Sequence, residues 1–170
     1  MKSLEIKELK ENFIETISKE WMLVTSGTRD QFNTMTASWG GIGFLWNKAV
    51  AFIFIRPERY TYEFIEQNDT LTLSFLGEDH RSIYTLCGSL SGRDTDKIKA
   101  SGLIPLFTPT DNITFEQARL TLECRKLYGQ FLSTESFQNR DFIEKWYGEH
   151  GHLHKMYIVE IVNIWVKKSQ

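Results

Sequence analysis

The sequence predicts an α+β fold that is mainly β, in which a small barrel of strands carries helices on its periphery. Six segments are β-rich and bounded by turn residues, and helical patterns lie between several of them. Residues 49–55 are apolar at every position, which indicates a strand covered on both faces, as in a barrel covered by helices. A chain of 170 residues fits one core, so we expect residues 1–170 to form a single domain.

The first expected element is an amphipathic helix over residues 5–18. Leu9, Phe13, Ile14 and Ile17 recur there at helical spacing within a stretch rich in Glu and Lys. This apolar stripe would pack on the body of the protein.

The expected strands follow from apolar and β-branched runs. Residues 71–75 alternate between apolar and polar side chains, as a half-buried strand does. Gly27 and the pair Gly40-Gly41 mark turns. The six strands are predicted at residues 21–25, 32–39, 49–55, 71–75, 119–128 and 155–166.

Further helices are expected between these strands. A loop should occupy residues 88–93, and Pro105 with Pro109 argues against regular structure nearby. The predicted helices cover residues 61–67, 82–86, 94–100 and 141–147.

Composition narrows the classes of function. The chain is 41% hydrophobic and 25% charged, an ordinary globular mixture, and its net charge is -2 with a pI near 6.1. No dense basic block is present, so nucleic acid is not an expected partner. The longest apolar run, residues 49–55, is far shorter than the roughly 20 residues that span a membrane, so no membrane association is expected.

The N-terminal residues and the cysteines indicate the cytoplasm. Residues 1–8 interleave charged and apolar side chains and lack the apolar centre of a signal peptide. Cys87 and Cys124 lie far apart without metal-ligand spacing, and neither has a histidine beside it in sequence. We therefore interpret both as small core residues in a reducing compartment.

A row of hydroxyl groups is the first candidate site. Thr34, Thr36 and Ser38 would share one face of an extended strand, with Met35 and Ala37 on the other. Such a row can bind a phosphate, a ribityl chain or the polar edge of a flavin. The alternative is that Thr is a favourable strand residue on a solvated sheet face.

Two arginines form the second candidate site. Arg56 and Arg59 follow a buried strand and precede a predicted helix, where free amides and the helix dipole favour an anion such as a terminal phosphate. Thr61 would either cap that helix or bind the same phosphate. The alternative is an exposed turn in which these arginines form weak ion pairs with Glu58 or Glu63.

The sequence gives little indication of a metal centre or of the common nucleotide-binding motifs. His150, His152 and His154 alternate, but Gly148 and Gly151 favour a turn and no acidic or Cys partner has metal spacing. His154 alone, just before a long strand, can donate to a substrate at a pocket mouth. No glycine-rich Rossmann fingerprint follows a strand and no Walker-type loop is present, so a nucleotide would need another architecture.

The combined motifs resemble one family. In order and spacing, the sequence resembles the flavin reductase-like family of FMN-binding split barrels, which includes flavoredoxin and NAD(P)H:flavin oxidoreductases. The resemblance implies a six-stranded antiparallel split barrel with peripheral helices, and a homodimer with FMN sites near the subunit interface. The segments that carry it are residues 33–39 (NTMTASW), 56–61 (RPERYT), 91–97 (SGRDTDK) and 122–124 (LEC).

The resemblance also implies roles for individual residues. Lys97 would add positive charge near the flavin, where it would stabilise a reduced, anionic ring. Many short-chain flavin reductases carry Gly-Asp-His by the nicotinamide; here residues 152–154 keep only the final His154. The implied flavin contacts are Thr34, Met35, Thr36, Ala37, Ser38 and Trp39 for the ring and ribityl chain, and Arg56, Arg59, Tyr60 and Thr61 for the phosphate.

Three functions remain open from the sequence. The leading hypothesis is an FMN-dependent oxidoreductase that passes hydride from NAD(P)H to flavin and then reduces a second small acceptor, such as free flavin or ferric iron. The second is a flavoredoxin-like electron carrier without its own nicotinamide site, which the altered residues 152–154 permit. The third is a split-barrel protein that has lost flavin and binds another planar ligand or a partner protein.

Overall fold

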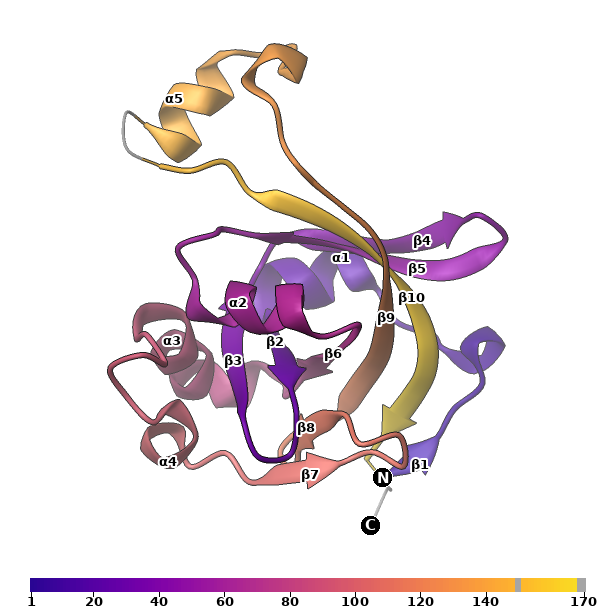
Figure 1. Cartoon of the computed structure of the whole chain (residues 1–170). Coiled ribbons are helices and arrows are strands. Elements are labelled where there is room, and N and C mark those ends of the chain that lie inside the picture. Colours follow the sequence, from indigo (N-terminus) through magenta and orange to yellow (C-terminus); the bar gives the residue numbers. More distant parts are fainter. Residues whose placement is uncertain (149–150, 168–170) are drawn as a thin grey trace.

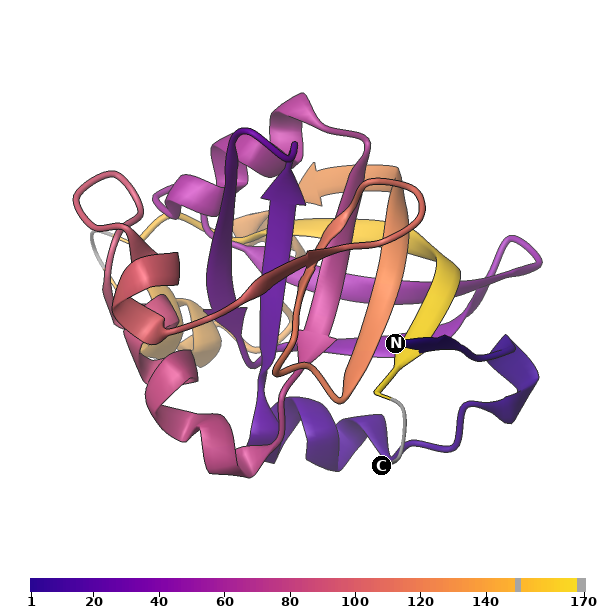
Figure 2. The same ribbon diagram turned by 90° about the horizontal axis from the view of Figure 1, so that it is seen from below.

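The sheet is antiparallel throughout and curls around one main core (Figures 1 and 2). The computed structural model describes residues 1–148 and 151–167. The strand order is β3-β2-β6-β9-β10-β5-β4; β1 adds to β10, and β7 pairs with β8. The bounds are β1 (Lys2–Ser3), β2 (Met22–Gly27), β3 (Phe32–Ala37), β4 (Gly40–Leu45), β5 (Lys48–Ile55), β6 (Thr70–Phe75), β7 (Pro105–Phe107), β8 (Ile113–Phe115), β9 (Leu120–Phe131) and β10 (Lys155–Val166).

The six expected strands are consecutive on this path, from β3 to β5. The seventh, β4, occupies a segment that the sequence predicted as a turn at Gly40-Gly41. That prediction was wrong: Gly40 pairs with Ile53 and Gly41 with Phe52 in a regular ladder. A Cβ at Gly40 would lie 2.6 Å from the carbonyl oxygen of Phe52. The glycine therefore permits a close backbone approach within a strand.

Strand β5 is covered more completely on one face than on the other. Ile53 and Ile55 are completely buried, whereas Phe52 and Phe54 on the opposite face are half-buried. The expectation of burial on both faces holds at Val50, which is completely buried on this second face, and was wrong at Phe52 and Phe54. Phe54 lines an open pocket. The apolar residues of β5 therefore serve both the core and the wall of this pocket.

Strands β9 and β10 are long and continue beyond the barrel. Their pairing shifts register between Ile158 and Val159 and again between Ile161 and Asn163, and such bulges bend a strand. Beyond the barrel the chain passes through η4 (Thr134–Ser136) and α5 (Asp141–Tyr147). Figure 1 shows α5 standing away from the barrel; we call residues 132–147 the arm.

Helices cover the barrel ends and one outer face (Figures 1 and 2). The main core joins the inner sheet face to Ile17 at one end and to Ile65 of α2 (Tyr60–Gln67) at the other. A second cluster packs α3 (Arg81–Ser89) against β2. Cys124 lies in the first cluster and Cys87 in the second, and both are free, buried thiols, as expected.

The N-terminal segment differs from the single helix predicted over residues 5–18. It contains a 3-10 turn η1 (Ile6–Glu8), a short α1 (Phe13–Glu15) and a π-helical turn η2 (Thr16–Glu20). The Asn12 side chain accepts a hydrogen bond from the Glu15 amide and starts the helix anew at residue 13. Ile14 is consequently 83% exposed. Local capping thus overrode the apolar periodicity.

Three later predictions need correction as well. Helix α4 (Lys97–Ser101) begins three residues after the predicted start, because the Asp96 side chain caps it by accepting from the Lys99 amide. The predicted loop at residue 88 is also wrong, since α3 continues to Ser89. Pro105 does not exclude regular structure: it is the first residue of β7, where a missing donor is tolerated.

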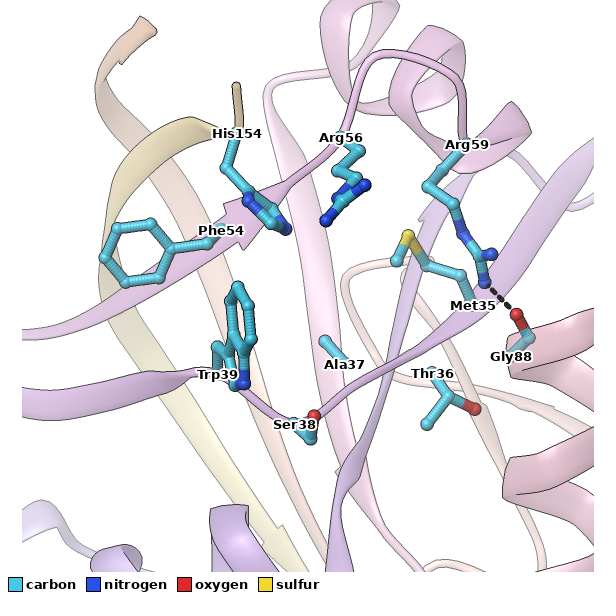
Figure 3. A pocket seen from close by; sticks show the side chains of 10 residues that line it. All are labelled: Met35, Thr36, Ala37, Ser38, Trp39, Phe54, Arg56, Arg59, Gly88 and His154. Carbon is cyan, nitrogen blue, oxygen red and sulfur yellow. Dashed lines mark hydrogen bonds between the residues drawn. The ribbon is translucent and has the colours of Figure 1, made fainter. Parts of the chain in front are cut away.

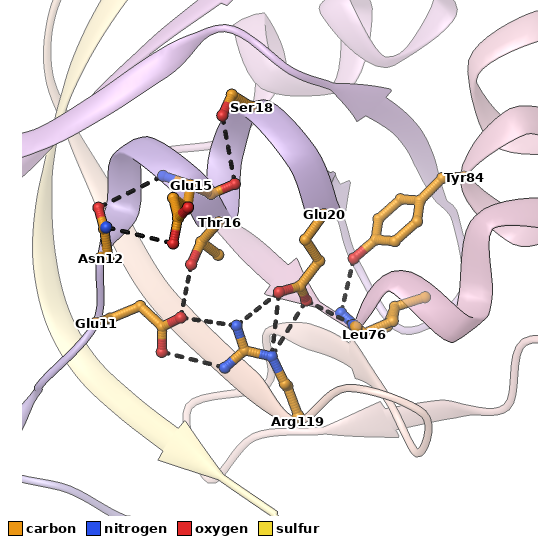
Figure 4. Close-up of polar contacts among 10 residues, drawn as sticks. Glu11, Asn12, Glu15, Thr16, Ser18, Glu20, Leu76, Tyr84 and Arg119 are labelled. Carbon is orange, nitrogen blue, oxygen red and sulfur yellow. Dashed lines mark hydrogen bonds and ion pairs between the residues drawn. The ribbon is translucent and has the colours of Figure 1, made fainter.

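An ionic network fastens the N-terminal segment to the barrel (Figure 4). The Arg119 guanidinium donates to Glu11 (Nη2 to Oε1, 2.8 Å) and to Glu20 (Nη2 to Oε2, 2.6 Å). Glu20 also accepts from the Gly77 amide at 2.5 Å. One buried carboxylate thereby joins the start of β9 to the segment after β6.

Among the residues described, no helix is long and apolar enough to cross a bilayer.

We expect Arg119→Met to lower the free energy of unfolding by about 1–3 kcal/mol, because it leaves the buried Glu20 carboxylate without its charged partner. Arg119 is 39% exposed, so solvent screening keeps the effect below that of a fully buried pair. Urea denaturation would measure it. Arg125→Met, which removes a more exposed pair with Glu160, should cost less than about 1 kcal/mol.

Arg119 also lowers the pKa of Glu11 through its hydrogen bond. This contribution to stability is present above the unfolded pKa of Glu and is lost as pH falls through the lower, folded value. On acidification, the free energy of unfolding of Arg119→Met should therefore fall less than that of wild type. Equal stability of wild type and variant at neutral pH would contradict the fastening role of the network.

Candidate functional site

A pocket of about 270 Å³ lies where the strand path is interrupted (Figure 3). The path starts at β3 and ends at β4, and residues 38–39 carry the chain from one to the other. Side chains at the end of β3, at the end of β5 and before β10 converge on this gap. The pocket is lined by Met35, Thr36, Ala37, Ser38, Trp39, Phe54, Arg56, Arg59, Gly88 and His154.

A second, smaller pocket of about 80 Å³ adjoins the first and shares Met35 and Arg59 with it. It lies at the N-terminus of α2, where Arg59 is the N-cap residue and its side chain makes no capping hydrogen bond. The first-turn amides, including those of Tyr60 and Thr61, have no partner within an α-helix. The lining residues are Met35, Glu58, Arg59, Tyr60, Thr61, Ser89, Leu90, Ser91 and Lys97.

Two positive charges at the smaller pocket are bonded only to neutral groups. Lys97 is 5% exposed, and its Nζ donates to the carbonyl oxygens of Thr34 and Cys87, both at 3.0 Å. Arg59 Nη2 donates to the carbonyl oxygen of Gly88 at 2.6 Å. Within residues 1–148 and 151–167, neither forms an ion pair with a carboxylate.

Burial makes these charges costly. It lowers the pKa of Lys97 to about 8, with a further contribution from the positive charge of Arg59. The pKa of Arg59 is also lowered, by burial and then by Arg56. An anion placed between Arg59 and Lys97 would offset both effects, so the smaller pocket has the electrostatics of an anion site.

The predicted hydroxyl row is present, but the fold already uses part of it. Thr34 is completely buried and its hydroxyl lies 2.9 Å from that of Thr25. The hydroxyl of Thr36 donates to the carbonyl oxygen of Tyr84 at 2.6 Å and so holds α3 against β3. Ser38 lies in the gap and lines the larger pocket. The pocket face of this segment is therefore formed by backbone and by Met35 as much as by hydroxyls.

Thr61 and Asn33 form a buried pair beneath the smaller pocket. The Asn33 amide Nδ2 donates to the Thr61 hydroxyl at 2.7 Å, and Thr61 is completely buried. Thr61 is the second residue of α2 and not its cap. Its side chain fixes α2 to β3, while its backbone amide belongs to the free first turn.

Arg56 and Arg59 lie on different walls. Arg59 lines both pockets, whereas Arg56 lines only the larger one. Arg56 Nη2 donates to the carbonyl oxygen of Trp146 at 2.7 Å, and its guanidinium lies 5.4 Å from the centre of the Tyr147 ring. Arg56 thus connects the pocket to the arm.

His154 sits in an aromatic wall of the larger pocket (Figure 3). Its ring centre is 5.1 Å from that of Trp39, and its Nδ1 is 3.0 Å from the Tyr147 hydroxyl. Burial, together with the nearby Arg56 charge, lowers the pKa of His154 to about 4. The imidazole is therefore neutral at neutral pH and can donate or accept one hydrogen bond toward the pocket.

His152 and His154, two of the three alternating histidines, bond to different partners. His152 Nδ1 lies 2.9 Å from Glu58 Oε1, while His154 bonds to Tyr147. His150 lies outside the described residues. Among the residues that are described, no group of three or more His, Cys, Asp or Glu is arranged to hold a metal ion.

Sequence reasoning missed several lining residues. Phe54 shares the strand parity of Arg56, so the pattern of β5 would have placed both on one face. Gly88, Ser89 and Leu90 gave no comparable signal, because α3 reaches the site only by packing against β3.

The comparisons with known proteins agree with this architecture. A family model described as flavin reductase like domain matches residues 14–170, and the chain belongs to this family. A search of curated proteins found no match.

Several solved structures share the fold. An FMN-binding protein from Thermus thermophilus with bound p-hydroxybenzaldehyde is 18% identical, with a TM-score of 0.68 over 99% of this chain and 83% of that one. A flavoredoxin from Methanosarcina acetivorans is 15% identical, with a TM-score of 0.67 over 99% and 77%. Component B of a nitrilotriacetate monooxygenase from Bacillus cereus is 14% identical, with a TM-score of 0.68 over 99% and 82%. The predicted split-barrel fold is thereby confirmed.

We expect the low pKa of His154 to appear in the pH dependence of stability. As pH falls from about 6.5 to about 4, the unfolded chain binds a proton at this residue that the folded protein does not, so the free energy of unfolding falls. In His154→Gln, the free energy of unfolding should fall by about 1–3 kcal/mol less than in wild type over this pH range. Urea denaturation at each pH would measure it. His152→Gln, at the surface, is the matched control. Parallel stability curves for wild type and His154→Gln would contradict a buried neutral imidazole.

Proposed function

We propose that this protein binds FMN across the two adjoining pockets and acts as a flavin-dependent oxidoreductase. One observation carries the proposal: Arg59 and Lys97 stand unpaired with any described carboxylate at the N-terminus of α2, next to a pocket with aromatic walls. A flavin mononucleotide combines the two features that these pockets would satisfy, a terminal phosphate and a planar ring.

The smaller pocket fits the phosphate. A phosphate monoester carries about -1.5 to -2 charges at neutral pH and three acceptor oxygens. Arg59, Lys97 and the amides of Tyr60 and Thr61 would supply donors and compensating charge. We assign Lys97 to the phosphate, because it lines the smaller pocket only. Arg56 would approach from the larger pocket, where the phosphate joins the rest of the ligand.

The larger pocket fits the ring. At about 270 Å³ it lies near the lower limit of small-molecule sites, roughly 300–1,000 Å³. The backbone of residues 34–39 would contact the ring edge and ribityl chain, and Trp39 and Phe54 would cover apolar ring surface. When bound, FMN supplies a ring that accepts hydride and passes electrons on. The residues around it exclude water and orient the ring.

NAD(P)H is the proposed electron donor, with a small molecule as the final acceptor. His154 supports a donor site, because a neutral imidazole at the pocket edge can hydrogen-bond to the amide of a nicotinamide without competing charge. A flavoredoxin-like carrier is the second candidate. It is favoured by the position of α5, whose Trp146 packs edge-on against Trp39 at 5.2 Å and occupies space beside the same pocket.

A homodimer in the cytoplasm is part of the proposal. Residues 1–170 would act as one FMN-binding unit, and a second copy would cover the apolar side chains near the arm. Phe131, beside the arm, and Phe142 and Trp146, within it, are each 45–49% exposed and leave apolar surface for a second copy to cover. The free thiols of Cys87 and Cys124 suit a reducing compartment.

Anaerobic absorbance spectroscopy of protein reconstituted with FMN would test the function. We expect a flavin spectrum that stays with the protein on gel filtration and bleaches rapidly on adding NADH or NADPH. Bound flavin that does not bleach would favour the carrier. If no flavin is retained, the cofactor assignment is wrong.

We expect Arg59→Gln to weaken FMN binding by about 1.5–3 kcal/mol, roughly 10- to 100-fold, because it removes a charged donor to the phosphate. Riboflavin, which lacks the phosphate, should lose less than about threefold. Isothermal titration calorimetry would give both affinities. Arg29→Gln, whose pair with Asp111 is exposed, is the matched control. A parallel loss of FMN and riboflavin would contradict a phosphate role for Arg59.

We expect His154→Gln to leave FMN affinity within about threefold of wild type and to slow flavin reduction by NAD(P)H about tenfold or more. The reason is that His154 borders the larger pocket, away from the phosphate. Anaerobic stopped-flow absorbance would measure the rate. An unchanged rate would remove His154 from the donor site.

A further inference from the structure

We infer that the smaller pocket selects a terminal phosphate monoester and that Arg93 closes it, so that the protein discriminates against flavins extended beyond the phosphate, such as FAD. This inference rests on the proposed flavin site. It assigns a specificity-determining role to a residue that lines neither pocket.

Arg93 bridges the loop beside the pocket to the first turns of α2. Its Nη1 donates to the carbonyl oxygen of Glu58 at 3.3 Å, and its Nη2 forms an ion pair with the Glu63 carboxylate. Its guanidinium also lies 4.8 Å from the centre of the Tyr60 ring, within the range of a cation–π contact. The Glu58 carbonyl, just before α2, and two side chains of its first turn therefore hold the Arg93 side chain, which is 43% exposed, beside the pocket.

The loop that carries Arg93 is itself fixed. The amides of Asp94 and Thr95 both donate to the carbonyl oxygen of Ser91, at 3.2 and 3.1 Å, and make a tight turn. A Cβ added at Gly92 would overlap the side chain of Asn33, the residue that also bonds to Thr61. Loop, β3 and α2 thus form one packed unit around the pocket, which cannot widen without breaking these contacts.

Size and charge both favour a monoester. A volume of about 80 Å³ holds a few water molecules or one phosphate group, and an adenosine monophosphate is much larger than the pocket. Arg59 and Lys97 match the charge of a dianion, whereas each phosphate of a diphosphate diester carries a single charge. Arg93 is already paired with Glu63, so it is not a free cation for an additional phosphate.

An extended flavin would have to leave the pocket between α2 and residues 89–93. Ser91 lines that side of the pocket, and Arg93 connects the two walls just beyond it. The added nucleotide would therefore need to displace Arg93 from Glu63 and Tyr60. Removing the Arg93 side chain should open this route without touching the donors to the phosphate.

The test is a comparison of FMN, FAD and riboflavin affinities, by calorimetry or flavin fluorescence, in wild type and Arg93→Ala. We expect wild type to bind FMN about tenfold or more tightly than FAD and riboflavin. Arg93→Ala should bind FMN within about threefold of wild type and gain about tenfold or more for FAD. Glu63→Gln, which releases Arg93 while keeping its charge, should shift FAD affinity in the same direction. Arg125→Ala, an exposed arginine elsewhere, is the control.

The outcomes separate this inference from the proposed function. Equal FMN and FAD affinity in wild type would overturn the closure while leaving the flavin site intact. Equal FMN and riboflavin affinity would remove the phosphate site itself, and no flavin binding would remove the proposed function. Loss of FMN binding in folded Arg93→Ala would make Arg93 a phosphate ligand and overturn its role as a barrier. Unchanged FAD affinity in both Arg93→Ala and Glu63→Gln would also overturn the role of Arg93 as a barrier.

Discussion

The interruption of the strand path between β3 and β4 is the constraint on which the site depends. Every other neighbour on the path is joined by an antiparallel ladder, and residues 38–39 alone carry the chain across this gap. The backbone there is not committed to a ladder, and the ends of β3 and β5 diverge around it. Helices α2 and α3 then pack beside the gap and convert it into two adjoining pockets. The same interruption that leaves the barrel split therefore creates its candidate binding site.

Positive charge has to be kept in this site at an energetic cost. Lys97 bridges two carbonyl oxygens from β3 and α3, and Arg59 bonds to a third from α3, so backbone dipoles offset part of the desolvation. The Lys97 bonds also connect α3 to β3, and the Arg59 bond connects the start of α2 to α3. The two cations therefore help to fix the walls of the pocket as well as making its electrostatic potential positive. A bound phosphate would complete the compensation. The proposed phosphate would therefore supply the negative charge that the described protein groups around Arg59 and Lys97 do not provide.

Much of this architecture followed from the sequence, because strand patterns are local. Six strands were predicted close to their observed positions in the chain, and residues 33–39 and 56–61 indicated the two segments that meet at the site. The sequence could not predict that Arg56 and Arg59 line different walls of the site. The Trp146 carbonyl that holds Arg56 lies 90 residues away in sequence. The broken N-terminal helix was missed because the Asn12 cap outweighs an apolar spacing. The buried bonds of Lys97 depend on how α4 and α3 pack and left no local pattern.

The most direct test of the account is the ionisation state of the bound phosphate, measured by ³¹P NMR of FMN on the protein. The second pKa of a free phosphate monoester is about 6, so its signal shifts as pH passes through that value. Between Arg59 and Lys97 the dianion should be retained, and the bound signal should stay constant from about pH 8 to about pH 5.5. A bound phosphate that titrates as it does in free FMN would lie in solvent, and would contradict the central claim that these two cations hold it.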